Sequence, residues 1–262
     1  MTTQKVLVFS SIVLIEWSAW FCGTTSAENV IFPLNAGVVD VTQSPYNAVG
    51  DGRTDATAAI QRALDDHPSS NRIIYLPNGT YLIRDTLRWP SGPRGGMEQK
   101  RVILQGQSRD GTVIRLDDSA EGFGDANEPK AMVWTGKAPA QRFRNGIRNL
   151  TFHTGQGNPG AIGVQFIANN QGSVRKVRIV CGDTAPIGLD LGYTNEQGPC
   201  LIQDVEIDGF DVGVSMRHAV DSVTLERIVV RDQRTVGILN AGQCLSLRDL
   251  KSSNTVPAVK NE

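Results

Sequence analysis

The sequence predicts an all-β chain wound as a parallel β-helix, with one α-helix near its N-terminus. Three observations support this prediction. Glycine is frequent (27 of 262 residues) and aromatic residues are scarce (6%), which suits many short strands and turns better than a helical bundle. Two kinds of short apolar segment recur in the second half of the chain every 22–28 residues, as in a solenoid with one coil per repeat. The segments between them are too short for crossover helices, which argues against leucine-rich and βαβ repeats.

The overall composition is that of a globular protein, with 40% hydrophobic and 20% charged residues. A length of 262 residues is enough for one or two domains. The 26 basic and 27 acidic residues leave a formal net charge of −1. This balance argues against a nucleic-acid-binding protein, which needs a basic surface.

Residues 1–27 have the layout of a secretory signal peptide. Lys5 precedes a mostly apolar run over residues 6–21, and small residues stand just before the expected cleavage point. The run is too short, and with Glu16 too polar, for a permanent membrane span. We therefore expect residues 28–262 to form the β-helix domain of a secreted or periplasmic protein that has no membrane contact after cleavage. The alternatives are an uncleaved N-terminal anchor and a mispredicted start codon.

Three cysteines remain after this segment, and we expect them to be free thiols. Cys181, Cys200 and Cys244 are odd in number and contain no CxxC spacing, so they do not indicate a zinc site. Cys200 and Cys244 are separated by about two coils, or ~9.6 Å, which exceeds the ~7 Å that a disulfide can bridge between Cα atoms.

One amphipathic helix is expected over Thr54–Asp66. Thr54 or Asp55 can cap its first turn, and Pro68 ends it. One face carries the residues Ala56, Ile60, Ala63, Leu64 and His67 at helical spacing. Short strands are expected over 73–76, 80–83, 101–105 and 112–116, and residues 117–145, which lack a clean period, are expected to form a long loop.

The first repeated segment has a glycine between two apolar residues, and the four glycines are 25, 25 and 24 residues apart. The second repeated segment alternates apolar and polar residues, so its apolar residues should stack inside the coils and its polar residues should form outward columns. The inward pairs are Leu150/Phe152, Val177/Ile179, Val205/Ile207 and Ile228/Val230. The first outward column is Asn149, Lys176, Asp204, Arg227 and Asp249, and the next is Thr151, Arg178, Glu206, Val229 and Lys251.

Asp204, Glu206 and Asp208 lie on one face of a predicted strand and could be taken for a calcium site. Their expected neighbours in the adjoining coils are basic, namely Lys176, Arg178, Arg227 and Arg231. Because coils are ~4.8 Å apart, opposite charges would lie side by side as cross-strand ion pairs. We therefore expect a charge ladder with no metal and no cofactor, and calcium binding is the less favoured alternative.

The glycine segments predict a second outward surface. If Gly163, Gly188, Gly213 and Gly237 face outward, they form a shallow floor without side chains, which a ligand can approach closely. The alternative is that these glycines only tighten a corner of each coil. The polar residues expected along this floor are Gln165, Asp190, Ser215 and Arg217, with Glu196 and His218 in the following loops.

The N-terminal stretches GDGRTDATAAIQRAL, IIYLPNGTYLI and VILQGQSRDGTVI resemble the start of the pectate-lyase superfamily domain shared by rhamnogalacturonases, epimerases and glycoside hydrolase families 28 and 55. The resemblance covers residues 37–114 and also extends to phage tailspikes. It implies an all-β, right-handed, single-stranded parallel β-helix with an N-terminal capping α-helix. The cap is expected at about residues 37–90 and the regular coils at about 146–262. We expect the domain to be incomplete at its C-terminus, because no segment follows to cover the last coil.

The resemblance implies a secreted protein that cleaves polysaccharides by hydrolysis or elimination. The catalytic residues that the column argument favours are Asp190 and Glu196, since no catalytic string diagnostic of the family is present. The substrate-binding candidates are Gln165, Ser215, Arg217 and His218. The alternatives are a non-catalytic glycan-binding or surface-attachment β-helix, and an inactive fragment whose catalytic coils are missing. The sugar, the linkage and the oligomeric state are not predicted.

Overall fold

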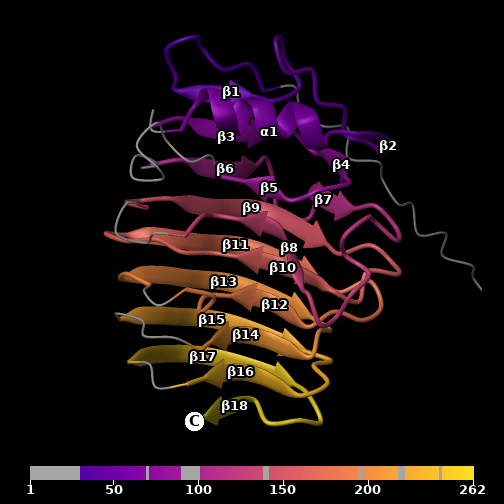
Figure 1. Ribbon diagram of the computed structural model, residues 1–262. Coiled ribbons are helices and arrows are strands. Elements are labelled where there is room, and N and C mark those ends of the chain that lie inside the picture. Colours follow the sequence, from indigo (N-terminus) through magenta and orange to yellow (C-terminus); the bar gives the residue numbers. More distant parts are fainter. Residues whose placement is uncertain are drawn as a thin grey trace, which may run out of the picture.

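The computed structural model describes residues 30–68, 71–89, 101–137, 142–194, 197–217, 222–241 and 244–262. These residues form one helix and eighteen strands, which stack along a single axis (Figure 1). The strands form two parallel sheets, one of eleven strands and one of seven. No helix in the described ranges is long and apolar enough to cross a membrane.

The eleven-stranded sheet contains the longer strands. Its main path is β1 (Val38–Asp40), β3 (Ile73–Leu76), β6 (Ile103–Gly106), β9 (Gly146–His153), β11 (Gly172–Val180), β13 (Cys200–Asp208), β15 (Val223–Arg231) and β17 (Leu245–Ser253), beside which lie β2 (Asp51–Asp55), β4 (Gly79–Ile83) and β7 (Thr112–Leu116). The seven-stranded sheet contains β5 (Leu87–Arg88), β8 (Lys130–Trp134), β10 (Ala161–Gln165), β12 (Ile187–Asp190), β14 (Val212–Met216), β16 (Val236–Asn240) and β18 (Val259–Asn261).

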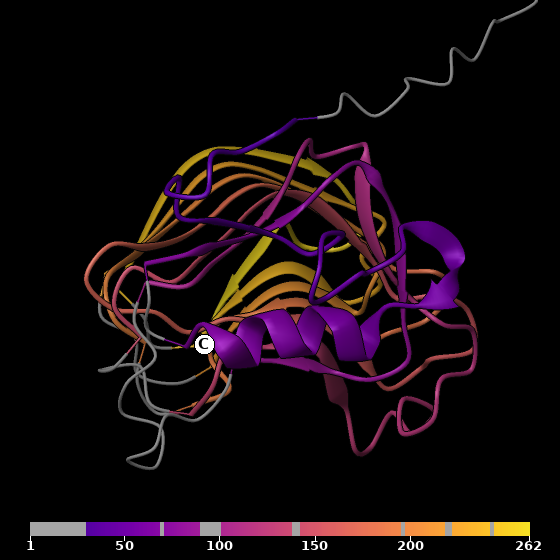
Figure 2. The same ribbon diagram turned by 90° about the horizontal axis from the view of Figure 1, so that it is seen from above.

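Successive coils place one strand in each sheet, and the coils superimpose around a common interior when viewed along the axis (Figure 2). Parallel strands joined in this way wind with the right-handed sense that strand twist favours. The fold prediction is therefore confirmed: the chain is a right-handed, single-stranded parallel β-helix.

The predicted interior column of the second segment is confirmed. Leu150, Val177, Val205 and Ile228 are paired in consecutive strands and are at most 1% exposed. Their stacking gives the interior a continuous apolar core. Burying a side chain of this size stabilises the fold by about 1.5–3 kcal/mol.

Each long strand of these coils is bent at one residue, which the sequence did not predict. Lys176 has a φ of 53° in the middle of β11, and it follows another outward residue, Arg175. A positive φ turns the strand, so that alternation resumes in the opposite phase at Val177. The same left-handed conformation recurs in every coil of the predicted outward column, at Asn149, Lys176, Asp204, Arg227 and Asp249, with φ between 53° and 57°.

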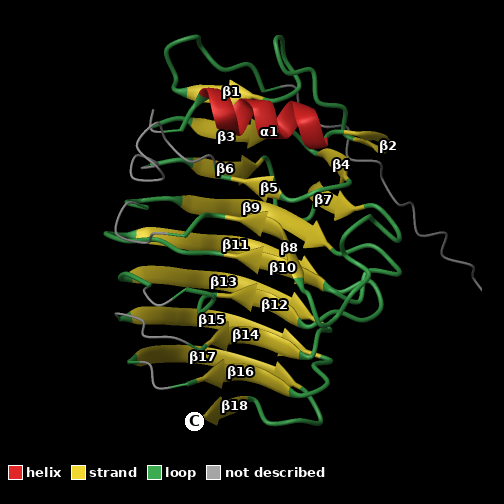
Figure 3. Ribbon diagram, in the orientation of Figure 1, coloured by secondary structure: helices red, strands yellow, loops and turns green. Residues whose placement is uncertain are grey.

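The helix α1 (Thr57–Asp66) lies across the N-terminal end of the stack (Figure 3). It begins three residues later than predicted, because Asp51–Asp55 pairs with β4 as strand β2. Asp55 still serves the first turn, since its Oδ1 accepts a hydrogen bond from the Thr57 amide at 2.9 Å. The helix buries Ile60, Ala63 and Leu64 against the core, so it caps the interior as expected.

The prediction that 117–145 is only a loop is wrong, because this segment contains β8. Ala131, Val133 and Trp134 pair with the first glycine-containing strand, β10. Met132 occupies the position that Gly163 takes in β10, and without a glycine the repeat is not recognisable in the sequence. At the other end of the chain, β18 pairs with β16 and adds a further strand to the seven-stranded sheet.

Candidate functional site

The glycine column faces the interior, so the prediction of an outward glycine floor is wrong. A Cβ added at Gly188 would lie 2.5 Å from Cγ2 of Ile207 and 2.9 Å from the carbonyl oxygen of Gly213. Ile207 belongs to the core, and Met132 at the corresponding position of β8 is fully buried. Ile187 and Leu189, which would share a face in a straight strand, belong to different apolar clusters. The strand therefore bends at Gly188, and the glycines form a tight corner of each coil.

The polar residues next to this corner do form one row on the outer side of the seven-stranded sheet. Gln165, Asp190 and Ser215 are paired in three consecutive strands. Nε2 of Gln165 donates a hydrogen bond to Oδ2 of Asp190 at 3.1 Å, and the Gly192 amide donates to Oδ1 at 3.1 Å. These donors hold the carboxylate in a fixed orientation.

Asp190 is less accessible than the sequence suggested. Only 5% of it is exposed, and Gln165 of the preceding coil already hydrogen-bonds to it. The adjacent Ser215 is 1% exposed, and its Oγ has no hydrogen-bond partner in the described part of the chain. Such an unpaired buried hydroxyl costs free energy unless a further group satisfies it.

The remaining predicted site residues divide into two groups. Arg217 is exposed, and its backbone amide lies beside Gly192 of the preceding coil, so it belongs to the same end of the row. Glu196 and His218 lie outside the described residues. The row thus brings together four of the six candidates: Gln165, Asp190, Ser215 and Arg217.

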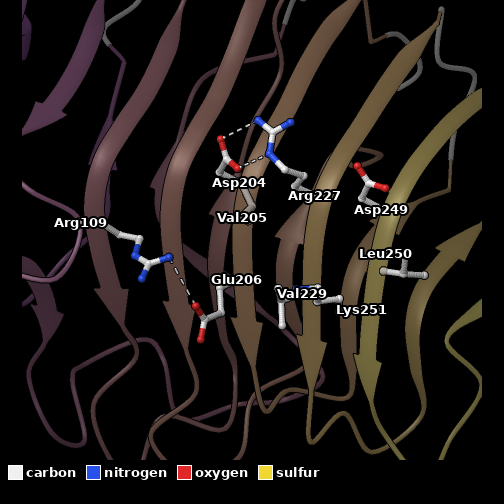
Figure 4. A pocket seen from close by; sticks show the side chains of 9 residues that line it. All are labelled: Arg109, Asp204, Val205, Glu206, Arg227, Val229, Asp249, Leu250 and Lys251. Carbon is white, nitrogen blue, oxygen red and sulfur yellow. Dashed lines mark hydrogen bonds and ion pairs between the residues drawn. The ribbon is translucent and has the colours of Figure 1, made fainter.

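The eleven-stranded sheet carries a second candidate surface, a pocket of about 570 Å³ (Figure 4). Arg227 donates to both carboxylate oxygens of Asp204, at 2.6 and 3.0 Å. These hydrogen bonds hold the pKa of the Asp204 carboxyl below its ordinary value. The pocket is lined by Arg109, Asp204, Val205, Glu206, Arg227, Val229, Asp249, Leu250 and Lys251.

The two other acids of this strand are paired in the same way. Arg178 and Arg231, from the coils on either side, both bind Glu206 and Asp208, and Arg178 Nη2 lies 2.6 Å from Asp208 Oδ2. The predicted ion pairs are thus present between these acids and the arginines of the adjoining coils. Lys176 and Asp249, the outermost charged residues of the first predicted column, form no ion pair with a described residue. Within the described ranges, no group of three His, Cys, Asp or Glu residues is arranged to hold a metal ion.

The comparisons with known proteins agree with this architecture. The family model described as "Rhamnogalacturonase A/epimerase, pectate lyase-like" matches residues 38–259. The chain belongs to this family. The match extends the resemblance of the N-terminal stretches through all the regular coils.

Three proteins illustrate the similarity of this pectate lyase-like chain to others. It is 29% identical over 122 residues to a glucan 1,3-beta-glucosidase of Cochliobolus carbonum (47% of this chain, 14% of the relative). It is 34% identical over 105 residues to the mannuronan C5-epimerase AlgE3 of Azotobacter vinelandii (38% of this chain, 5% of the relative). The catalytic unit of a GH87 alpha-1,3-glucanase from Streptomyces thermodiastaticus has the same fold, with a TM-score of 0.53 at 15% identity (89% of this chain, 44% of that chain). The chain therefore corresponds to a minor part of these relatives.

Two features of this pectate lyase-like chain were missed because they lie in or beside the expected loop. Trp134 ends β8 and extends the row, since it pairs with Gln165. Arg142 is 2% exposed, and its Nε and Nη1 have no partner among the described residues. Burial lowers the pKa of this guanidinium to about 10. The KAMVW strand signal was present in the sequence, but the burial of Arg142 had no sequence signal.

The three cysteines are free thiols. Cys200 is buried, and burial raises the pKa of its thiol to about 12. A thiol with this pKa is protonated near neutral pH and is a poor nucleophile. Cys200 is therefore not a candidate nucleophile.

Proposed function

We propose that the chain is a secreted glycan-acting protein whose substrate lies along the outer row of the seven-stranded sheet. The observation that carries this proposal is the alignment of Gln165, Asp190 and Ser215 on three consecutive coils. A row that crosses the coils at ~4.8 Å intervals offers hydrogen-bonding groups repeatedly along an extended polymer. The family and the glycan-directed names of its relatives support the same reading.

In this proposal Asp190 transfers the proton. Its carboxylate is oriented by the Gln165 amide and the Gly192 N–H. It can exchange a proton with a substrate group while both of these hydrogen bonds are kept. Arg217 lies at the same end of the row and is exposed, which suits it to bind or neutralise a substrate oxygen. Glu196 is the proposed second acid, and His218 is a further proposed substrate ligand.

The two cleavage chemistries make different demands on this row. Hydrolysis needs a second carboxylate, ~5–5.5 Å away for retention or ~6.5–9.5 Å away for inversion. Elimination needs a base and a cation that stabilises the charge developing beside a uronate carboxylate. Asp190 with Glu196 would serve the first reaction, and Asp190 with Arg217 the second.

A non-catalytic glycan-binding protein is the second candidate. One observation favours it: Asp190 is 5% exposed and is the only acid in the described part of its row, which continues through Trp134, Leu239 and Lys260. A binding module needs donors and acceptors along the row but no accessible proton-transfer group.

The two functions are separated by screening the chain on a panel of polysaccharides for new reducing ends and for the absorbance of unsaturated uronates. We expect activity that Asp190→Asn lowers by ~10²–10⁴-fold, the effect of losing an acid–base group. The melting temperature should change little, because the Asn oxygen can accept from the Gly192 amide while the Gln165 side-chain amide turns its oxygen toward the Asn NH2 group. Full activity in both Asp190→Asn and Glu196→Gln would refute the assignment. Binding without turnover in the unmodified protein would favour the second candidate.

A further inference from the structure

We propose that the outer face of β9 and β11 binds a phosphate group between Arg148 and Arg175. These two arginines are paired in adjacent coils of the eleven-stranded sheet, which lie ~4.8 Å apart (Figure 1). The site is thus on a different sheet from the row described above, and the inference does not depend on the proposed function. Like charges directly opposite each other destabilise a pair of strands, so a bound anion would relieve an unfavourable contact.

A glutamine on each side orients one of the two guanidinium groups. Gln105, Arg148, Arg175 and Gln203 form one row across four consecutive strands of the sheet. Nε of Arg148 donates to Oε1 of Gln105 at 2.6 Å, and Nε of Arg175 donates to Oε1 of Gln203 at 3.2 Å. These bonds use only Nε, so each guanidinium has two Nη groups left to donate to a ligand. Orienting the side chains in advance lowers the entropy lost on binding.

The positive charge of this pair is only weakly compensated. The two strands contain no acid and four basic residues, namely Arg148, Arg175, Lys176 and Arg178. Neither Arg148 nor Arg175 forms an ion pair with a residue in the described ranges. Asp204 on β13 interacts electrostatically with Arg175, but Arg227 already donates to both of its carboxylate oxygens. Burial and the charge of Arg175 lower the pKa of the Arg148 guanidinium.

The surface beside the pair adds a hydroxyl donor and leaves room for a ligand. Ser173 lies two residues before Arg175, so the two side chains face the same side of the sheet. Its partner in β9 is Gly146, where an added Cβ would lie 3.8 Å from Oγ of Ser173. Because glycine has no side chain at this position, the Ser173 hydroxyl can donate to an anion held by the arginines.

A phosphate group matches this arrangement better than a carboxylate or a sulfate ester does. Two guanidinium groups carry two positive charges, and a phosphate monoester carries about −1.5 to −2 at neutral pH. A carboxylate or a sulfate ester carries a single negative charge. The oxygens of a tetrahedral phosphate can also accept from both arginines at once, whereas one bidentate arginine satisfies a planar carboxylate. We therefore expect the ligand to be inorganic phosphate or a small phosphate monoester.

The test is a calorimetric titration of the full chain with inorganic phosphate, glucose 6-phosphate and galacturonate. The two phosphate compounds distinguish a free anion from a phosphate ester, and galacturonate is the carboxylate control. We expect at least one phosphate compound to bind at least tenfold more tightly than galacturonate, with an affinity that decreases with salt. Tighter binding of either phosphate compound supports the proposal and identifies the form of the ligand.

Arg148→Gln and Arg175→Gln should each weaken phosphate binding by about tenfold, as expected for loss of a charge-assisted contact. Arg248→Gln is the matched control, because Arg248 lies in the same row on β17, is exposed and forms no ion pair with a described residue. It makes the same charge change and should leave binding unchanged. Gln203→Glu should weaken binding as much as Arg175→Gln does, because the new carboxylate would pair with Arg175 and compete with the ligand.

Equal weakening in Arg248→Gln would overturn the proposal, because binding would then follow net charge alone. Galacturonate binding as tight as phosphate binding would also overturn it, and so would the absence of saturable binding of both phosphate compounds. If Arg148→Gln fails to fold, Arg175→Gln and Gln203→Glu still decide the outcome, since neither position is buried. Unchanged phosphate affinity in both of these variants would exclude the site.

Discussion

Nη1 of Arg109 lies 3.5 Å from Oε2 of Glu206, although 97 residues separate them in the sequence. Arg109 belongs to the turn between β6 and β7, and its carbonyl accepts a hydrogen bond from Oγ1 of Thr151 at 2.7 Å. The turn is thereby attached to β9, and its side chain reaches β13, two coils further on. The irregular N-terminal half and the regular coils thus share one charge network.

Glu206 is the centre of this network, and Glu206→Gln should destabilise the chain by roughly 1–2 kcal/mol, the scale of hydrogen bonds to charged groups. Three arginines, Arg109, Arg178 and Arg231, would lose their shared carboxylate. Asp249→Asn is the control, because Asp249 is exposed and has no ion pair with a described residue. Urea unfolding measures both changes, and equal stability of the two variants would contradict the central role of Glu206.

Gly188→Ala should destabilise the chain by about 1–3 kcal/mol, the usual cost of overpacking a core. The new Cβ would lie 2.5 Å from Cγ2 of Ile207 and 2.9 Å from the Gly213 carbonyl oxygen. Gly124→Ala is the control, because a Cβ there meets no atom within 4 Å. Thermal unfolding compares them. An unchanged melting temperature in Gly188→Ala would contradict the inward orientation of these glycines.

These two cases show which parts of the structure could be predicted. Val177 and Val205 were placed correctly because apolar side chains that alternate with charges identify the buried face. Glycine has no side chain whose polarity would indicate a buried or an exposed face. Gly188 was therefore assigned to the outer face by counting alternate residues, and the bend in the strand makes that count wrong. The hydrogen bond between Gln165 and Asp190 depends on rotamers that the repeat does not specify. The strand containing Met132 was missed because it has methionine in place of the glycine by which the repeat was recognised.

Lys176→Asn should stabilise the chain by about 0.5–1 kcal/mol. Lys176 has a φ of 53°, a conformation that costs most L-residues roughly 1–2 kcal/mol and that Asn tolerates better. The equivalent residues Asn149, Asp204 and Asp249 already have this type of side chain. Lys251→Asn makes the same change at ordinary strand geometry and should be neutral or slightly destabilising. A melting temperature that falls equally in both variants would exclude backbone strain at Lys176.

Asp204→Asn should lower stability at neutral pH, and should lower it less in acid. The pKa of the Asp204 carboxyl is lowered mainly by hydrogen bonds from Arg227, so the ionised form is favoured by folding. A depressed folded-state pKa contributes stability above the unfolded value, ~3.9, and that contribution is lost as the pH falls through the folded value. Asn also tolerates the positive φ of this position, so the variant changes only the charge. Unfolding at pH 7, 5 and 3 should show a difference from the unmodified chain that is smaller at the lowest pH than at pH 7. A constant difference would exclude the ion pair as its cause.

Arg142→Met should raise stability by about 1–4 kcal/mol, the range found when buried charged groups are replaced by apolar ones of similar size. Arg142 is 2% exposed, its Nε and Nη1 are unpaired within the described residues, and burial lowers its pKa to about 10. The cost of desolvating this charge is therefore poorly compensated. Arg148→Met is the matched control, because Nε of Arg148 donates to Oε1 of Gln105 at 2.6 Å, and losing that bond should lower stability by about 1 kcal/mol. A lower free energy of unfolding for Arg142→Met than for the unmodified chain would contradict this prediction. It would show that the buried guanidinium stabilises the fold.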